Sequence, residues 1–226
     1  MSTLPLGDTD RLMAAKCLYE TSSSHRWQDL RSTQDNKQNF PYDKELKRHL
    51  EALNVSVLAD RLVWVPFSRL ENVWKGTVRW RPHQYISGVY DHGYASNDFP
   101  RNTDAVEREF ALKEIDSSMA SEVVLAAHLS WNRDFFYPGP TMDLIGLSYH
   151  PIRNKYLMVM ECADNNLEDH LLSTTTTSWR ETIHLAGALA YQLSECHDFG
   201  VLHHDLHARN VVLGVLGSEP GQAAVR

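Results

Sequence analysis

The most informative stretch of this chain is Gly200-Val201-Leu202-His203-His204-Asp205-Leu206-His207-Ala208-Arg209-Asn210-Val211-Val212-Leu213. It opens with a glycine of the kind that ends helices, and it closes with a short apolar run typical of a strand. Between them lies a polar loop in which Asp205 and Asn210 are five positions apart. A polar turn that happens to contain these two residues is the plain alternative. A zinc site is disfavoured, because adjacent side chains rarely converge on one tetrahedral ion; the residues concerned are His203, His204, Asp205 and His207.

The segment upstream of Gly200 predicts a long helix from Trp179 to Phe199. Apolar residues recur there at steps of three and four, which is the spacing of one helix face. The expected buried stripe consists of Ile183, Ala186, Leu189 or Ala190, Leu193 and Cys196. The whole arrangement is therefore a helix, a glycine stop, a polar loop and a strand.

This loop resembles the catalytic loop of eukaryotic-type protein kinases, H-R-D-L-x-x-x-N, with His204 in place of the usual Arg. The resemblance implies that Asp205 lies at the acceptor hydroxyl and that Asn210 is an oxygen ligand of Mg²⁺ beside the phosphates of ATP. His203 would pack and orient the loop. The resemblance spans roughly residues 62 to 226, and the loop is its most specific part.

The run Phe110-Ala111-Leu112-Lys113 is similar to the kinase strand motif V-A-I-K, and Lys113 precedes Asp205 by 92 residues (205 minus 113). By resemblance, Lys113 neutralises the α- and β-phosphates and pairs with a helix glutamate. Glu122 is the acidic residue of the following helix that could be this partner. Its separation of nine residues from Lys113 is shorter than the family pattern, so an exposed helix charge is an equal alternative.

The run from Tyr156 to Ala163 resembles the strand and hinge that receive adenine. Met160 would take the gatekeeper position, and Glu161 and Cys162 would offer backbone groups to the base. Leu144-Ile145-Gly146 fits the preceding strand, and Leu167 to Leu171 fits the short helix after the hinge.

The expected architecture is a two-lobed, kinase-like α+β fold, in which the N-lobe is an antiparallel sheet with one helix. Its domains are an extension over residues 1–61, an N-lobe over 62–160 and a partial C-lobe over 161–226. Residues 1 to about 40 are expected to be a mobile extension, followed by an amphipathic helix at about 42–62. The other expected elements are hairpin arms at Leu62–Phe67 and Val73–Trp80, a loop over 81–106, strands at Glu109–Ile115, Met142–Leu147 and Tyr156–Glu161, and a helix over Ser117–Leu129 capped by Ser117 or Ser118.

Two features depart from the family pattern. Alignment of a glycine-rich loop with the strand at Val73 places Pro66, Ser68 and Glu71 at the three glycine positions, where side chains would obstruct the approach to phosphate. After Asn210 the chain gives Gly214 to Arg226 without a D-F-G segment, whose Asp would bind Mg²⁺. A chain truncated after the catalytic loop is the corresponding expectation.

Composition limits the other possibilities. The chain has 22 basic and 29 acidic residues, a net charge of -7 and no long basic run, so DNA or RNA is not an expected partner. Three dispersed cysteines favour a reducing compartment. No apolar run approaches the length of a membrane span, so an intracellular, cytoplasmic or nuclear protein is expected.

The leading hypothesis is ATP- and Mg²⁺-dependent phosphoryl transfer to a protein hydroxyl. Ser/Thr and Tyr acceptors both stay open, because the marker positions hold His207 and Arg209. A small-molecule phosphotransferase of the aminoglycoside or choline type is favoured by Asp205-Leu206-His207. An inactive pseudokinase that acts as a binding module is the third possibility, favoured by the missing glycines and the missing D-F-G.

Overall fold

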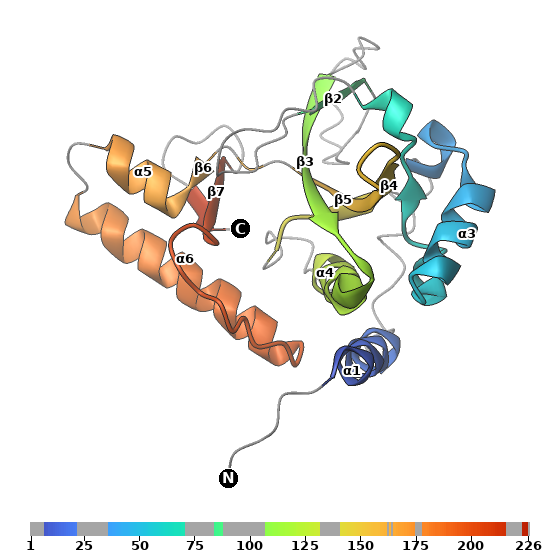
Figure 1. Cartoon of the computed structure of the whole chain (residues 1–226). Coiled ribbons are helices and arrows are strands. Elements are labelled where there is room, and N and C mark those ends of the chain that lie inside the picture. The colour runs from blue at the N-terminus through green and yellow to red at the C-terminus, as the bar shows by residue number, and fades with distance from the viewer. Residues whose placement is uncertain are drawn as a thin grey trace, which may run out of the picture. The chain divides into compact units, whose positions relative to one another are not determined.

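The computed structural model describes residues 7–21, 36–70, 84–87, 107–131, 141–161, 163, 165–174, 178–215 and 223–225. Its helices are α1 (Asp8–Thr21), α3 (Asp43–Ala52), α4 (Ala120–Trp131), α5 (Leu167–Ser173) and α6 (Trp179–Asp198), with 3-10 turns η2 (Ser56–Leu58), η3 (Phe67–Arg69) and η4 (Ser117–Met119). Its strands are β1 (Val63–Trp64), β2 (Gln84–Ser87), β3 (Glu107–Ile115), β4 (Leu144–His150), β5 (Lys155–Glu161), β6 (Asn165–Asn166), β7 (Val212–Val215) and β8 (Ala223–Val225). The protein is therefore of mixed α+β class (Figure 1).

The chain divides into two compact units, each of which is assembled from separated segments. The sheet unit comprises residues 25–123 and 144–162, and the helical unit comprises residues 1–24, 124–143 and 163–226. The expected extension over residues 1–61 is thus shared between the two units.

The sheet unit is built on five strands in the order β1-β4-β5-β3-β2. β4, β5, β3 and β2 are paired antiparallel, whereas β1 runs parallel to β4, so the sheet is mixed rather than wholly antiparallel. Figure 1 shows β3 beside β5 in the middle of this sheet. The expected strands at 109–115 and 156–161 correspond to β3 and β5.

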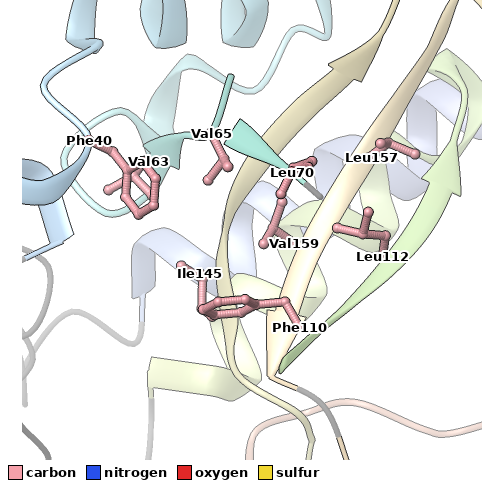
Figure 2. Packing of buried hydrophobic residues seen from close by; sticks show 9 residues of the cluster. All are labelled: Phe40, Val63, Val65, Leu70, Phe110, Leu112, Ile145, Leu157 and Val159. Carbon is pink, nitrogen blue, oxygen red and sulfur yellow. The ribbon is translucent and has the colours of Figure 1, made fainter. Parts of the chain in front are cut away.

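One cluster of buried side chains fills the core of the sheet unit (Figure 2). β3 contributes Phe110 and Leu112, and β5 contributes Leu157 and Val159, so each strand places alternate residues in the cluster. Phe40 joins them from a segment that the sequence assigned to a mobile extension. The cluster consists of Phe40, Val63, Val65, Leu70, Phe110, Leu112, Ile145, Leu157 and Val159.

Residues 1 to about 40 are not featureless where the structure describes them. α1 buries Leu12, Ala15 and Tyr19, and a methyl group built on Gly200 would lie 3.2 Å from Leu18 Cδ2. The expectation of a mobile extension is wrong for these residues. Its polar composition hid a helix that buries three residues, while Met13 on the same helix is exposed.

The helix expected at about 42–62 is shorter than the sequence suggested. α3 ends at Ala52, and Asn54 has a left-handed φ of 57°, which stops helical propagation. Leu46 and Leu50 are buried as expected, and Leu58 is buried from the separate turn η2.

The first arm of the hairpin expected after residue 62 overlaps β1. β1 has two residues, Val63 and Trp64, and it pairs with β4. The second expected arm, at 73–80, lies outside the described residues. β2 lies inside the expected loop over 81–106 and pairs with β3, so that part of the loop prediction is wrong.

The helical unit carries a small antiparallel sheet, β6-β7-β8, and the long helix α6. Ser178 and Glu181 form a capping box at the start of α6, and Gly200, with a φ of 75°, follows its end. None of the helices within the described ranges is long and apolar enough to cross a membrane.

The buried face of α6 differs from the expected stripe. Leu185, Ala188 and Leu189 pack against Val211 and Leu213 of the strand that follows the polar loop. Further along α6, Gln192 and Cys196 are buried. Ile183, expected inside, is more than half exposed. A polar residue in the buried stripe, Gln192, explains why hydrophobic spacing alone selected the wrong face at the start of the helix.

Candidate functional site

Lys113 and Glu122 form an ion pair in the sheet unit. Lys113 is on β3, opposite Met158 of the neighbouring strand, and Glu122 is in the first turn of α4. Both side chains are partly exposed. The structure thus brings together the strand lysine and the helix glutamate that the sequence could only list as possible partners.

The short connection between them is made by η4. Asp116 accepts hydrogen bonds from the backbone amide and hydroxyl of Ser118, and these bonds lower the pKa of its carboxyl. Ser118, expected as a cap, is instead a donor to Asp116, which supplies an accepting side chain before α4. The Ser117 side chain, the other expected cap, lies outside those that the structure describes. The chain turns within three residues, so a separation of nine between Lys113 and Glu122 is long enough for the pair.

The polar loop of the helical unit brings Asp205 and Asn210 into contact. The Asn210 side-chain amide donates to the Asp205 carboxylate and to its backbone carbonyl, each at 3.0 Å. Because both acceptors are oxygens, they fix the orientation of the amide. The amide oxygen of Asn210 lies on the other side of the same planar group and is a hard ligand of the kind that Mg²⁺ prefers.

Local backbone bonds fold this loop tightly. The Asp205 amide donates to the His203 carbonyl at 2.8 Å, and the Asn210 amide donates to the His207 carbonyl at 2.9 Å. Between them, His204 adopts a φ of 58°, a left-handed conformation that is uncommon outside glycine. The Asp205 side chain is 77% exposed, so its carboxylate is accessible to a substrate.

His207 lies next to the Asp205 carboxylate, with Nε2 at 3.7 Å from Oδ2. Its Nδ1 accepts the Arg209 backbone amide at 3.2 Å, so the neutral ring carries its proton on Nε2, facing Asp205. His203 is exposed rather than packed, and the orienting role expected for it has no contact behind it in the loop as described.

The expected hinge begins at the end of β5. Met160 pairs with Ala111 and Glu161 pairs with Phe110, so both lie on the strand next to the one that carries Lys113. Cys162 lies outside the described residues.

The placement of the glycine-rich loop on residues 66–71 is not supported. Pro66 and Ser68 lie at η3, directly after β1, which is the edge strand paired with β4. β4 and β5 separate β1 from β3, so three strand spacings of about 4.8 Å put this turn roughly 14 Å from the strand of Lys113. These two side chains therefore do not obstruct a phosphate at Lys113. Glu71 lies outside the described residues.

Several supporting residues were not singled out from the sequence. His128 of α4 is buried, and its Nε2 is 3.1 Å from the Phe199 carbonyl at the end of α6. Arg209 Nε donates to Glu168 at 2.8 Å. A histidine within an otherwise apolar helix is the sequence signal that could have indicated the first contact. No local pattern signals the second, because its partners are 41 residues apart.

Among the described residues, no group of three or more His, Cys, Asp or Glu side chains is arranged to hold a metal ion. The zinc alternative therefore has no site in these ranges. Lys113 and Glu122 belong to the sheet unit, whereas Asp205 and Asn210 belong to the helical unit.

A mixed α+β fold with a lysine–glutamate pair in one unit and an Asp/Asn loop in the other is what the structure itself defines. No protein-family model matches the chain, and no curated protein matches it either.

Proposed function

We propose that this chain is a two-lobed protein-kinase-like domain that catalyses ATP-dependent phosphoryl transfer to a protein hydroxyl, with Mg²⁺ as the metal. The observation that carries the proposal is the Lys113–Glu122 ion pair. In protein kinases the strand lysine must be paired with a helix glutamate for activity. The pair joins a central part of the sheet to the first turn of α4, which is the arrangement that this requirement describes.

The loop residues supply the second half of the proposal. Asp205 would accept the proton of the acceptor hydroxyl at its exposed carboxylate, and Asn210 would hold Mg²⁺ through its amide oxygen. The Asn210 amide donates one hydrogen bond to this carboxylate and one to the Asp205 backbone carbonyl. Magnesium, when bound, neutralises charge that develops on the transferred phosphate.

The remaining roles concern ATP. Lys113 would neutralise its α- and β-phosphates, and Glu122 would hold the lysine in the required rotamer. The end of β5 at Met160 and Glu161, together with Cys162, would receive the adenine through backbone groups. An amide and a carbonyl suffice for that contact, so the identity of these side chains is weakly constrained.

A second candidate is a phosphotransferase for small molecules such as aminoglycosides or choline. The observation that favours it is the His207 ring beside Asp205, which places a second titratable group at the acceptor carboxylate. The acceptor, rather than the nucleotide, distinguishes this candidate from the first.

The test is transfer of γ-labelled phosphate from Mg·ATP by the full chain. Polypeptides rich in Ser, Thr and Tyr are offered as acceptors in parallel with an aminoglycoside and choline. We expect label on a polypeptide, and a loss of about a hundredfold or more in Asp205→Asn, because a positioned general base contributes 10²–10⁴-fold.

The matched control is Asp198→Asn, which removes an exposed carboxylate at the end of α6 and should leave transfer unchanged. Label on the small molecules alone would favour the second candidate. Phosphate transfer that survives Asp205→Asn would contradict both candidate functions. A folded chain that transfers no phosphate would favour the inactive pseudokinase.

A further inference from the structure

We infer that Glu168 is a positioning residue that holds the Asp205–Asn210 loop through Arg209. The first observation is that Glu168 contacts two successive loop residues. Its carboxylate accepts from Arg209 Nε at 2.8 Å, and its backbone amide donates to the Ala208 carbonyl at 3.3 Å. Both contacts fall on the turn that immediately precedes Asn210.

Glu168 is itself held rigidly. It lies in the first turn of α5, where the Asn166 side chain caps the helix by accepting from the Asp169 amide at 2.8 Å. The adjacent Leu167 amide donates to the Val211 carbonyl at 2.8 Å, and Asn166 pairs with Val212 in the β6–β7 ladder. A capped helix start and a strand pair thus fix the point from which Glu168 reaches the loop.

The loop has few other supports among the described residues. Leu202 to His207 are all exposed, so side-chain packing does not hold them. Backbone hydrogen bonds anchor the two ends of the loop. The Val201 amide donates to the Cys196 carbonyl, and the Leu167 amide donates to the Val211 carbonyl. Between these anchors, the Arg209–Glu168 bond is the side-chain contact that joins the loop to a neighbouring element. The geometry of Arg is suited to this, because its planar guanidinium restrains direction as well as distance.

The structural part of this inference stands alone, and its kinetic part rests on the proposed function. If Glu168 positions the loop, its loss should loosen the bonds that define the loop without unfolding the protein. Asp205 and Asn210 would then meet their ligands in a broader range of geometries. A loss of that kind lowers kcat more than it changes KM, because it affects the reacting arrangement and not the nucleotide contacts.

The experiment compares amide hydrogen exchange in the full chain and in Glu168→Gln and Arg209→Lys. The reporters are the amides of Asp205, Arg209 and Asn210, all of which are hydrogen-bonded within the loop. We expect their exchange to rise about fivefold in Glu168→Gln, the scale of a partly exposed ion pair, while β3 and β5 are unaffected. Arg209→Lys keeps the charge and should show a smaller increase of the same pattern.

The double variant Glu168→Gln/Arg209→Gln separates positioning from general destabilisation. If the two side chains act through each other, the double variant changes loop exchange no more than Glu168→Gln alone does. Tyr191→Phe, which removes an exposed hydrogen bond to Glu195 on α6, is the control and should leave loop exchange unchanged. Loop exchange identical to wild type in Glu168→Gln overturns the inference.

The kinetic arm uses Mg·ATP and the best acceptor found for the chain. We expect kcat to fall roughly tenfold in Glu168→Gln with KM for ATP nearly unchanged. An increase in KM for ATP with kcat unchanged would contradict a positioning role for Glu168. If the chain transfers no phosphate at all, the proposed function fails, and the exchange experiment alone then decides the role of Glu168.

Discussion

At the scale of single residues, His49 joins α3 to the edge of the larger sheet. Its ring stacks on Trp64 with centroids 4.0 Å apart and planes inclined by 7°. Its Nε2 is 3.0 Å from Arg48 Nη2, which can only donate, so the proton of the neutral ring is on Nδ1, 3.1 Å from the Tyr156 hydroxyl. This arrangement requires a neutral histidine.

The surroundings of His49 predict a pH dependence of stability. Burial, and secondly the Arg48 guanidinium, lower the pKa of His49 below its ordinary value of 6.5, with Glu45 opposing them. As the pH falls, His49 is therefore protonated in the unfolded chain before it is protonated in the folded chain. The stability contribution is fully present above pH 6.5 and is lost as the pH falls from there through the lowered pKa. Tyr149 and Tyr156 also face the ring. Burial raises the pKa of Tyr156, so its hydroxyl stays protonated throughout this window.

The measurement is the urea midpoint of the full chain between about pH 5 and about pH 8. His49→Phe keeps a ring that can stack on Trp64 but cannot titrate. As the pH is lowered below 6.5, the urea midpoint of this variant should therefore decrease less than that of wild type. His184→Gln, an exposed change on α6, should keep the wild-type slope. Equal slopes in wild type and His49→Phe would show that another group carries the dependence.

At the scale of elements, the pairing of β1 with β4 depends on one glycine, Gly146 of β4, which leaves room for the β1 backbone. Val63 is the parallel partner of Gly146, and the β4–β5 register shifts at this point. A methyl group built on Gly146 would lie 2.2 Å from the Val63 carbonyl oxygen. That neighbour is backbone and cannot rotate away, so β1 and a side chain at position 146 exclude each other.

Substitution at this glycine should therefore release the edge strand. We expect Gly146→Ala to lower the free energy of unfolding by about 3 kcal/mol, the upper range for overpacking. Gly187→Ala is the matched control: nothing lies within 4 Å of its methyl position in the middle of α6, and the change should stabilise the protein by up to about 1 kcal/mol. Urea denaturation of both variants measures the difference. Equal stabilities would contradict the β1–β4 pairing.

The sequence indicates some elements well and others poorly, for identifiable reasons. β3, β5 and α6 follow from local pattern. β3 and β5 contain short apolar runs, and α6 repeats apolar residues at helical spacing before the stop at Gly200. β1 cannot be predicted from local pattern, because its partner on β4 is more than 80 residues away in the sequence. Gly146 indicates that another part of the backbone approaches closely, but the sequence does not identify that part. The Arg209–Glu168 contact is hidden in the same way.

At the scale of the whole molecule, the expected lobes and the observed units differ in membership. The segment 1–24, read as part of an extension, belongs with α6 and the polar loop, and the division passes through α4 between Val123 and Val124. Sequence pattern cannot assign these segments, because membership depends on tertiary packing of a few residues such as Leu18 beside Gly200. The candidate site residues, in contrast, come from the resemblance of local motifs to those of protein kinases, and Glu122 is the acidic residue available on the following helix.

The proposed function requires that Lys113 and Asn210 both act on one nucleotide. In the structure Glu122 pairs with Lys113, and Asn210 donates a hydrogen bond to Asp205. Binding of ATP that depends on both residues would support this central claim.

The most direct measurement is calorimetric titration of the full chain with ATP, with and without Mg²⁺. We predict magnesium-dependent binding, weakened about tenfold or more in Lys113→Met through loss of a charge-assisted contact, and no longer enhanced by magnesium in Asn210→Ala. Lys155→Met is the control, because Lys155 is a strand lysine of matching exposure, 44% against 45% for Lys113. A folded protein that ignores Mg·ATP, or one whose affinity is the same in Lys113→Met and Lys155→Met, would contradict the claim.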